Sequence, residues 1–477
     1  MPRSATTEPD ATRDRLLPVE PGVREIARDL YARVAAAPII SPHGHVPAAL
    51  LADDAPFEEP ATLLLARDHY IHRMLHAEGV ALSEVTGDQI DPRNAWRLLG
   101  RHFPTLDGTA SSYWLQDQLR TVFGIDDALT EASADVIYER VRTQLGTPEY
   151  RPRALFDRFD ISVLATTDDP LDDLAAHERL RADPSFTGRV VPTFRPDAYI
   201  DADGDGFISA VSRLLACTRN PSTFAGYLDA LRERRAYFVD RGAVSLDVGV
   251  VNALTVDLTS SEAETIFQRV LRGSATPGER RAFRGHAVLQ LAGMCLDDGL
   301  TMTLHAGVFR NHSPQTHARY GSDTGHDIPT AVAFTEPLKP LLDKYGLDSR
   351  LRLILFCIDE LAYSREIAPL AGFYPSVFVG APWWFLDAPD SLLRWRSAVT
   401  EIAGFYRTSG FIDDTRAFLS IPSRHDVSRR VDAAFLARYV AQGRLREADA
   451  ARIIDDTVDA IPRRAFGLSQ EEEVTRA

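Results

Sequence analysis

Two histidines separated by a single residue, His43 and His45, close a short apolar stretch that begins at Pro38. Residues two apart in a β-strand lie on the same side, so both imidazoles can face one point. Imidazole is a common ligand of zinc and similar divalent ions, but two ligands leave such a site incomplete. The spacing therefore predicts half of a metal site, with a third ligand supplied from elsewhere in the chain.

Polar and aromatic side chains follow several other apolar, β-branched stretches of the chain. They are Thr167, Asp168, Asp169, Arg195, Asp247, His305, Trp383, Trp384, Asp414 and Arg416. Taken singly, each has a simpler interpretation: His305 as a buried histidine bonded to a backbone carbonyl, Asp414 as a helix N-cap, and the tryptophans as core packing. Their joint occurrence at the ends of strand-like stretches favours one shared pocket.

Strand-like and helical patterns alternate along most of the chain. The predicted strands cover residues 38–43, 162–167, 190–194, 243–247, 302–305, 351–357, 376–379 and 411–413. Helical patterns between them include residues 221–239, 262–271, 278–298, 329–345 and 390–408. This alternation indicates a parallel sheet of the α/β class, and eight units favour a (β/α)8 TIM-type barrel over an open doubly wound sheet. The carboxyl ends of barrel strands are where catalytic residues lie.

The patterns predict five parts of the chain, including a helical subdomain inserted after the first strand. These parts are residues 1–15, a disordered N-terminus; 16–50, a helix and the first strand; 51–153, the helical insertion; 154–430, the rest of the barrel; and 431–477, C-terminal helices and a tail with an acidic run at 471–473. The insertion is rich in aromatic residues and has no strand pattern, and we expect it to pack over the barrel mouth.

Composition narrows the class of partner. The 477 residues are 45% hydrophobic and carry a formal charge of −15, which disfavours binding to nucleic acid or to an anionic membrane. No stretch resembles a secretory signal or a membrane span. The three widely spaced cysteines, Cys217, Cys295 and Cys357, indicate reduced thiols in a cytoplasmic protein. An anionic small molecule would need a local arginine cluster, and assembly into a homo-oligomer is left open.

Motifs that carry these residues occur in a recognisable order. They are His43-Gly44-His45, Asp68-His69-Tyr70 with Arg73, 166–170, 194–197, 304–307 with Arg310-Asn311, 321–325, 383–385, 414–420 and Arg424-His425. In content and order they resemble the uronate isomerase family of the amidohydrolase superfamily. The resemblance implies interconversion of D-glucuronate with D-fructuronate, and of D-galacturonate with D-tagaturonate. It also implies one divalent metal ion, commonly zinc, held by His43, His45 and Asp414, with His305 lining the same site.

The resemblance further implies roles in catalysis and in substrate binding. Asp414 would accept the carbon-bound proton, Tyr70 would move a proton between the two substrate oxygens, and Arg416 would lie near the reacting end. The residues expected to bind substrate are Arg195 and Arg310 at the C6 carboxylate, His69 and Asp247 at hydroxyls, His305 beside the metal, and Trp383 and Trp384 as an aromatic wall.

Alternatives remain open at this level. A mononuclear metal-dependent hydrolase would use Asp414 to activate a bound water, and another acid-sugar isomerase or epimerase would bind the carboxylate with different arginines. A binding protein with a degenerate site would have lost metal ligands, yet every matched ligand is present. Departures from the usual family pattern at Ser41-Pro42, Ile71-His72 and Val248 bear on which acid sugar is the substrate.

Overall fold

The computed structural model describes residues 13–66, 68–87, 90–204 and 206–468. Most of the predicted disordered segment at 1–15, and the acidic run at 471–473, lie outside the described residues. Within the described part of the chain, no helix is both long enough and apolar enough to cross a membrane.

Parallel strands follow one another in space in the order of the chain. The first sheet contains β1 (Ile39–Ser41), β2 (Ile161–Ala165) and β3 (Arg189–Val191), and the second contains β4 (Thr193–Phe194), β5 (Ser245–Val250), β6 (Thr301–Ala306), β9 (Leu353–Cys357) and β10 (Val377–Val379). Every neighbouring pair is parallel. This arrangement is that of an α/β barrel, as the strand and helix alternation predicts.

The third predicted strand is divided between the two sheets. Its halves β3 and β4 pair with β2 and β5 respectively, and Pro192 separates them. Proline has no amide hydrogen to donate, so the ladder of hydrogen bonds cannot run through this position.

The predicted eighth strand at residues 411–413 is not a regular strand. Ser409 N donates to Val379 O at 2.9 Å, and His45 N donates to Thr415 O at 3.0 Å, so this segment joins the last strand to the first. Gly410 has φ +73° and Asp414 has φ +42°. Two left-handed residues within five interrupt the extended geometry that a strand needs.

The predicted helix at residues 329–345 is wrong over its first half, since only α16 (Lys339–Tyr345) is helical there. The backbone amides of Phe334 and Thr335 donate instead to the carboxylate of Glu366, at 2.6 and 2.9 Å. A buried side-chain acceptor thus replaces the helical carbonyls.

The other helices surround the strands. The main ones are α1 (Pro21–Val34), α11 (Phe207–Thr218), α12 (Phe224–Val239), α13 (Ser260–Leu271), α14 (Pro277–Asp298), α18 (Ala368–Phe373), α19 (Pro389–Ala403), α20 (Ile421–Ala441) and α21 (Glu447–Val458). Capping boxes at Thr259 and Thr276 start α13 and α14, with Glu262 and Glu279 completing them. The apolar faces of α1, α20 and α21 share one buried cluster.

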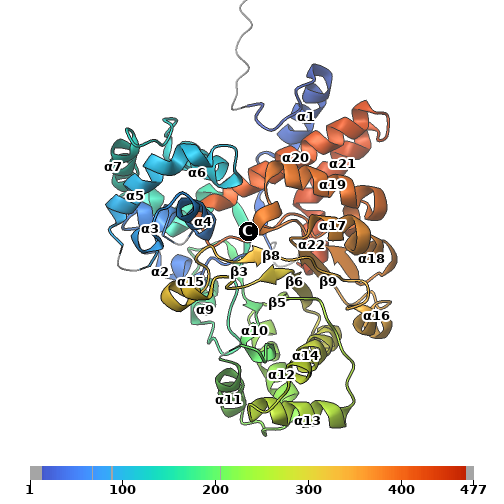
Figure 1. Cartoon of the computed structure of the whole chain (residues 1–477). Coiled ribbons are helices and arrows are strands. Elements are labelled where there is room, and N and C mark those ends of the chain that lie inside the picture. The colour runs from blue at the N-terminus through green and yellow to red at the C-terminus, as the bar shows by residue number, and fades with distance from the viewer. Residues whose placement is uncertain (1–12, 67, 88–89, 205, 469–477) are drawn as a thin grey trace, which may run out of the picture.

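The described residues between β1 and β2 form seven α-helices: α2 (Ala48–Asp53), α3 (Pro60–Leu64), α4 (His69–Ala77), α5 (Pro92–His102), α6 (Ala110–Phe123), α7 (Ala134–Leu145) and α8 (Pro152–Arg158). Helices α3 to α7, blue to teal in Figure 1, gather on one side of the central strands. Their buried side chains form a single apolar cluster that continues into Ile39, Ile161 and Leu164. This shared core fixes the segment against the first two strands of the barrel.

Asp168, at the end of β2, links the second and third strands. Its Oδ2 accepts from Thr166 Oγ1 at 2.6 Å and from Thr193 N at 3.2 Å. Burial raises the pKa of Asp168 to about 7, despite these two hydrogen bonds. Between about pH 4 and pH 7, the folded state therefore keeps a proton on Asp168 that the unfolded chain, with a pKa near 3.9, has released.

Asp168→Asn is expected to change how stability depends on pH. Because the folded pKa is the higher one, the wild-type free energy of unfolding should fall as pH rises from about 4 to about 7 and level off above, by at most about 1.4 kcal/mol per pH unit from this group. The asparagine variant should gain stability relative to wild type over this interval. Urea unfolding between pH 5 and pH 8 measures the difference. Asp173→Asn, an exposed change on the same loop, should run parallel to wild type; parallel behaviour of Asp168→Asn would contradict the assignment.

Candidate active site

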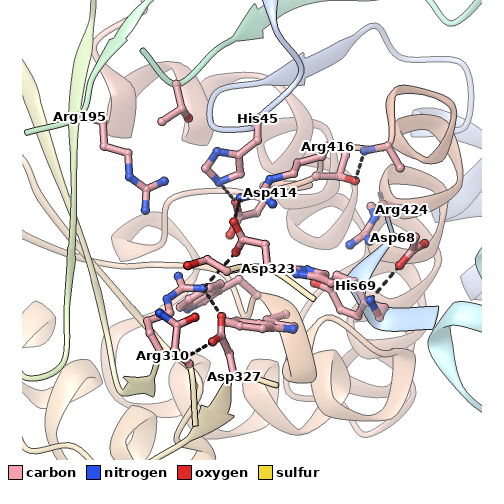
Figure 2. A pocket seen from close by; sticks show the side chains of 18 residues that line it. His45, Asp68, His69, Arg195, Arg310, Asp323, Asp327, Asp414, Arg416 and Arg424 are labelled. Carbon is pink, nitrogen blue, oxygen red and sulfur yellow. Dashed lines mark hydrogen bonds and ion pairs between the residues drawn. The ribbon is translucent and has the colours of Figure 1, made fainter. Parts of the chain in front are cut away.

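A cavity of about 560 Å³ opens at the carboxyl ends of the strands. Figure 2 shows the side chains that line it. They are His45, Asp68, His69, Tyr70, Thr167, Arg195, Arg310, Asn311, Ser322, Asp323, Asp327, Trp383, Trp384, Asp414, Thr415, Arg416, Ala417 and Arg424. The lining therefore combines strand ends, the first turn of α4, and the loop between the short strands β7 (Val308–Phe309) and β8 (Ile328–Pro329).

Local interactions place the residues of the inserted helices at this cavity. Asp68 is the N-cap of α4 and accepts from Tyr70 N at 2.9 Å and Ile71 N at 3.1 Å. The cap at Asp68 fixes the start of α4, so that His69 and Tyr70 occupy its first turn. The His69 ring stacks on Trp384, with centroids 5.2 Å apart and planes 4° from parallel.

The left-handed turn at Asp414 sends two neighbouring carboxylates in different directions. Asp414 lines the cavity. The Oδ2 atom of Asp413 instead lies 3.1 Å from Nε2 of His425, a buried residue of α20. The φ of +42° at Asp414 is unusual for a residue with a side chain, and here it directs the carboxylate to His43 and His45, which follow β1.

Nitrogen and oxygen atoms converge on one point beside β1. Ligand atoms of His43, His305 and Asp414 all lie within 4.8 Å of one another. Asp414 Oδ1 is 2.9 Å from His45 Nε2 and 3.4 Å from His43 Nε2. Among the described residues, neither Asp414 Oδ1 nor His305 Nε2 has a hydrogen-bond partner of good geometry. Buried lone pairs that converge without hydrogen bonding fit a divalent cation.

The compact cluster differs from the predicted ligand set in one member. It includes His305, predicted only to line the site, and leaves out His45, although His45 contacts the same carboxylate oxygen. The two histidines of the motif stand nearly perpendicular, with ring planes 81° apart. The structure thus brings the three histidines together around Asp414.

Asp247 lies behind this cluster and does not line the cavity. It is buried, and its Oδ1 contacts His305 Nδ1 at 2.7 Å and accepts from Thr303 Oγ1 at 2.8 Å. Burial opposes its ionisation, but His305, His43 and Arg195 hold the pKa of Asp247 well below its usual range. A carboxylate on the far nitrogen of a histidine orients that ring and strengthens it as a ligand.

Tyr70, in the first turn of α4, also lines the cavity. Its hydroxyl donates to Asp387 Oδ2 at 3.4 Å, and Arg424 Nη1 donates to the same oxygen at 2.6 Å. Arg424 in turn lies over the Trp114 ring, 3.8 Å from its centroid. Burial, followed by the charge of Asp387, raises the pKa of Tyr70 well above its usual value. The phenol is therefore protonated at neutral pH and able to donate its proton.

Arginines supply the positive charge that an anionic ligand requires. Arg195 pairs with Asp197 at 2.9 Å and lies 3.3 Å from Asp247. Arg310 pairs with Asp327 at 2.9 Å and lies over the Trp384 ring at 5.0 Å. With Arg416 and Arg424, the part of the cavity lining that the structure describes contains four guanidinium groups.

A model of the glucuronate isomerase family matches residues 22–462. The chain belongs to this family. A uronate isomerase from Corynebacterium efficiens is 47% identical over 460 residues, which cover 95% of this chain and 98% of the relative. The crystal structure of glucuronate isomerase from Caulobacter crescentus aligns with a TM-score of 0.93 at 45% identity, over 96% of this chain and 97% of that one. A Thermotoga maritima uronate isomerase aligns with a TM-score of 0.90 at 26% identity, over 95% and 99% of the two chains.

Family membership confirms the resemblance drawn from the sequence motifs. Of the residues predicted for the site, the cavity is lined by His45, His69, Tyr70, Arg195, Arg310, Trp383, Trp384, Asp414 and Arg416. His43, His305 and Asp247 lie directly behind it. Sequence reasoning assigned no role to Asp323, Asp327, Asp387 or Arg424. Asp323 and Arg424 stand inside quoted motifs, but no sequence pattern marks Asp327 or Asp387.

Proposed function

We propose that this chain interconverts D-glucuronate and D-fructuronate, D-galacturonate and D-tagaturonate, or both pairs, by proton transfer through a cis-enediol. The observation that carries the proposal is the contact of Asp414 with two imidazoles at a cavity that Tyr70 and, among the described residues, four arginines also line. A carboxylate base, a protonated phenol and guanidinium groups are the side chains that isomerisation of an anionic sugar requires.

The side chains divide the proton transfers between them. Asp414 takes the proton from C2 of the aldose and returns it to C1, which converts the enediol to the ketose. Tyr70 donates its proton to O1 as the carbonyl is reduced to a hydroxyl, and takes the proton that O2 releases as the new carbonyl forms. Arg416 stabilises negative charge at the reacting end, and Arg195 and Arg310 hold the C6 carboxylate. His69 donates to a hydroxyl, and Trp383 and Trp384 form an apolar wall beside the sugar chain.

We propose that one zinc ion is the native cofactor, held by His43, His45 and Asp414 with His305 beside them. Imidazole nitrogen and carboxylate oxygen are ligands that suit zinc, and the convergence of their atoms supports the assignment. When bound, the ion would supply Lewis acidity toward the substrate oxygens. We also propose a cytoplasmic location, which the three free cysteines support.

Isomerisation in deuterated water tests the proposed function. Zinc-loaded protein incubated with D-glucuronate, and separately with D-galacturonate, should form the corresponding ketose. As deuterium enters the carbon next to the carbonyl, the signal of that carbon's protons should weaken in the proton spectrum. The base exchanges its proton with solvent, so deuterium should enter during turnover. Protein stripped with a chelator serves as the control and should regain activity with zinc. Unchanged substrate for both hexuronates would overturn the proposal.

A further inference from the structure

The loop between β7 and β8 lies along the mouth of the cavity and is anchored on both sides. At one end, Asp327 is buried and accepts from Arg310 Nη1 at 2.9 Å and Asn311 N at 2.6 Å. In its middle, Gly325 packs on the α4 residue Arg73 so closely that a Cβ atom would lie 2.8 Å from the Arg73 Cβ. With φ +93° as well, this position strongly favours glycine. These two contacts hold the neighbouring residues of the loop at the cavity.

Asp323, two residues before this contact, lies between two arginines from different parts of the barrel (Figure 2). Its Oδ2 accepts from Arg416 Nη2 at 2.9 Å, and its Oδ1 lies 3.9 Å from Arg310 Nη1. The Asp323 side chain is 34% exposed, and the side chains of Arg416 and Arg310 are 42% and 41% exposed. Solvent, and therefore a small solute, reaches all three groups.

The other guanidinium groups of the cavity have carboxylate partners that a ligand cannot displace. Arg195, Arg310 and Arg424 contact carboxylates whose side chains are 1%, 3% and 5% exposed. These partners are Asp247, Asp327 and Asp387. Arg416 pairs with Asp323, which among the described residues is the one carboxylate partner of these arginines that is both part-exposed and part of the cavity lining.

We propose that Asp323 is a displaceable counter-ion in the sugar-acid site: it neutralises Arg416 and faces Arg310 until the C6 carboxylate of the ligand binds Arg310 and displaces it, which frees Arg416 for the reacting end. The inference rests on the proposed function for the identity of that ligand as a hexuronate. A resident carboxylate at this position weakens anion binding, because its attraction to Arg310 and Arg416 must be lost before the ligand gains the attraction of these two groups. It also disfavours ligands that lack a carboxylate, since they leave the Asp323–Arg416 pair intact.

Asp323→Asn tests this inference with little disturbance to the loop. Asparagine is nearly the same size as aspartate and is tolerated at the φ of +60° that Asp323 adopts. Calorimetric titration of the zinc-loaded protein with D-gluconate, which has the carboxylate and hydroxyls but no carbonyl, measures binding without turnover. We expect binding to become about three- to fivefold tighter, the range that a part-exposed ion pair supports.

Two further measurements isolate the charge effect. D-glucitol, a neutral analogue measured as a competitor of D-gluconate, should bind wild type and variant alike. Asp343→Asn, which removes one exposed negative charge on α16 outside the cavity lining, should leave the Kd of D-gluconate unchanged. Weaker or unchanged D-gluconate binding to Asp323→Asn would overturn the inference, as would equal tightening by Asp343→Asn or no D-gluconate binding to either protein. Because turnover is not the readout, failure of isomerisation is distinguishable from failure of this inference.

Discussion

Asp414→Asn is expected to lower kcat for D-glucuronate by about a thousandfold or more while the protein remains folded. General-base catalysis contributes roughly 10²- to 10⁴-fold, and the same substitution weakens the metal site. Burial opposes ionisation of Asp414, but His43 and His45 hold its pKa well below the usual range, so the wild-type base is ionised at neutral pH. Steady-state kinetics, bound zinc and circular dichroism of the variant measure the three parts of this expectation.

The adjacent aspartate provides the matched control for this variant. Asp413 is buried and differs from Asp414 in direction, because it contacts His425 on α20 rather than His43 and His45. Asp413→Asn should keep zinc and retain kcat within about tenfold, since an amide still bonds to that imidazole. Retained activity in Asp414→Asn, with zinc still bound, would remove Asp414 from proton transfer.

Tyr70→Phe is expected to lower kcat by about a hundredfold with a much smaller change in KM. The substitution removes only the hydroxyl, which is the group proposed to move a proton between O1 and O2, and leaves the ring in its contacts with His69 and Trp114. Initial rates of ketose formation over a range of D-glucuronate concentrations separate kcat from KM.

Tyr113→Phe is the matched control for the tyrosine variant. Tyr113 lies on α6 of the same inserted segment, and its buried hydroxyl has no hydrogen-bond partner among the described residues. Its removal should leave both kinetic constants within about twofold of wild type. A Tyr70→Phe variant with more than a third of wild-type kcat would show that another group moves the oxygen-bound proton.

Much of the secondary structure is readable from the sequence because its causes are local. Apolar stretches bounded by polar residues mark most of the strands, and Thr259 and Thr276, each with a glutamate three residues later, mark helix starts. The alternation of these elements indicates a parallel barrel. Two predictions are wrong. The distant carboxylate of Glu366 accepts from amides that a helix at 329–338 would use, and the left-handed residues Gly410 and Asp414 interrupt the last strand.

The sequence by itself determined the barrel class, the family and most of the residues that reach the cavity, since side-chain alternation and motif order are properties of neighbouring residues. Only the tertiary structure decided how those residues are paired. It placed His305 in the compact cluster with His43 and Asp414, and Asp247 behind that cluster. It also paired Arg416 with Asp323, on a loop 93 residues away along the chain. Such pairings depend on distances between segments that no local pattern encodes, because the packing of the whole chain sets them.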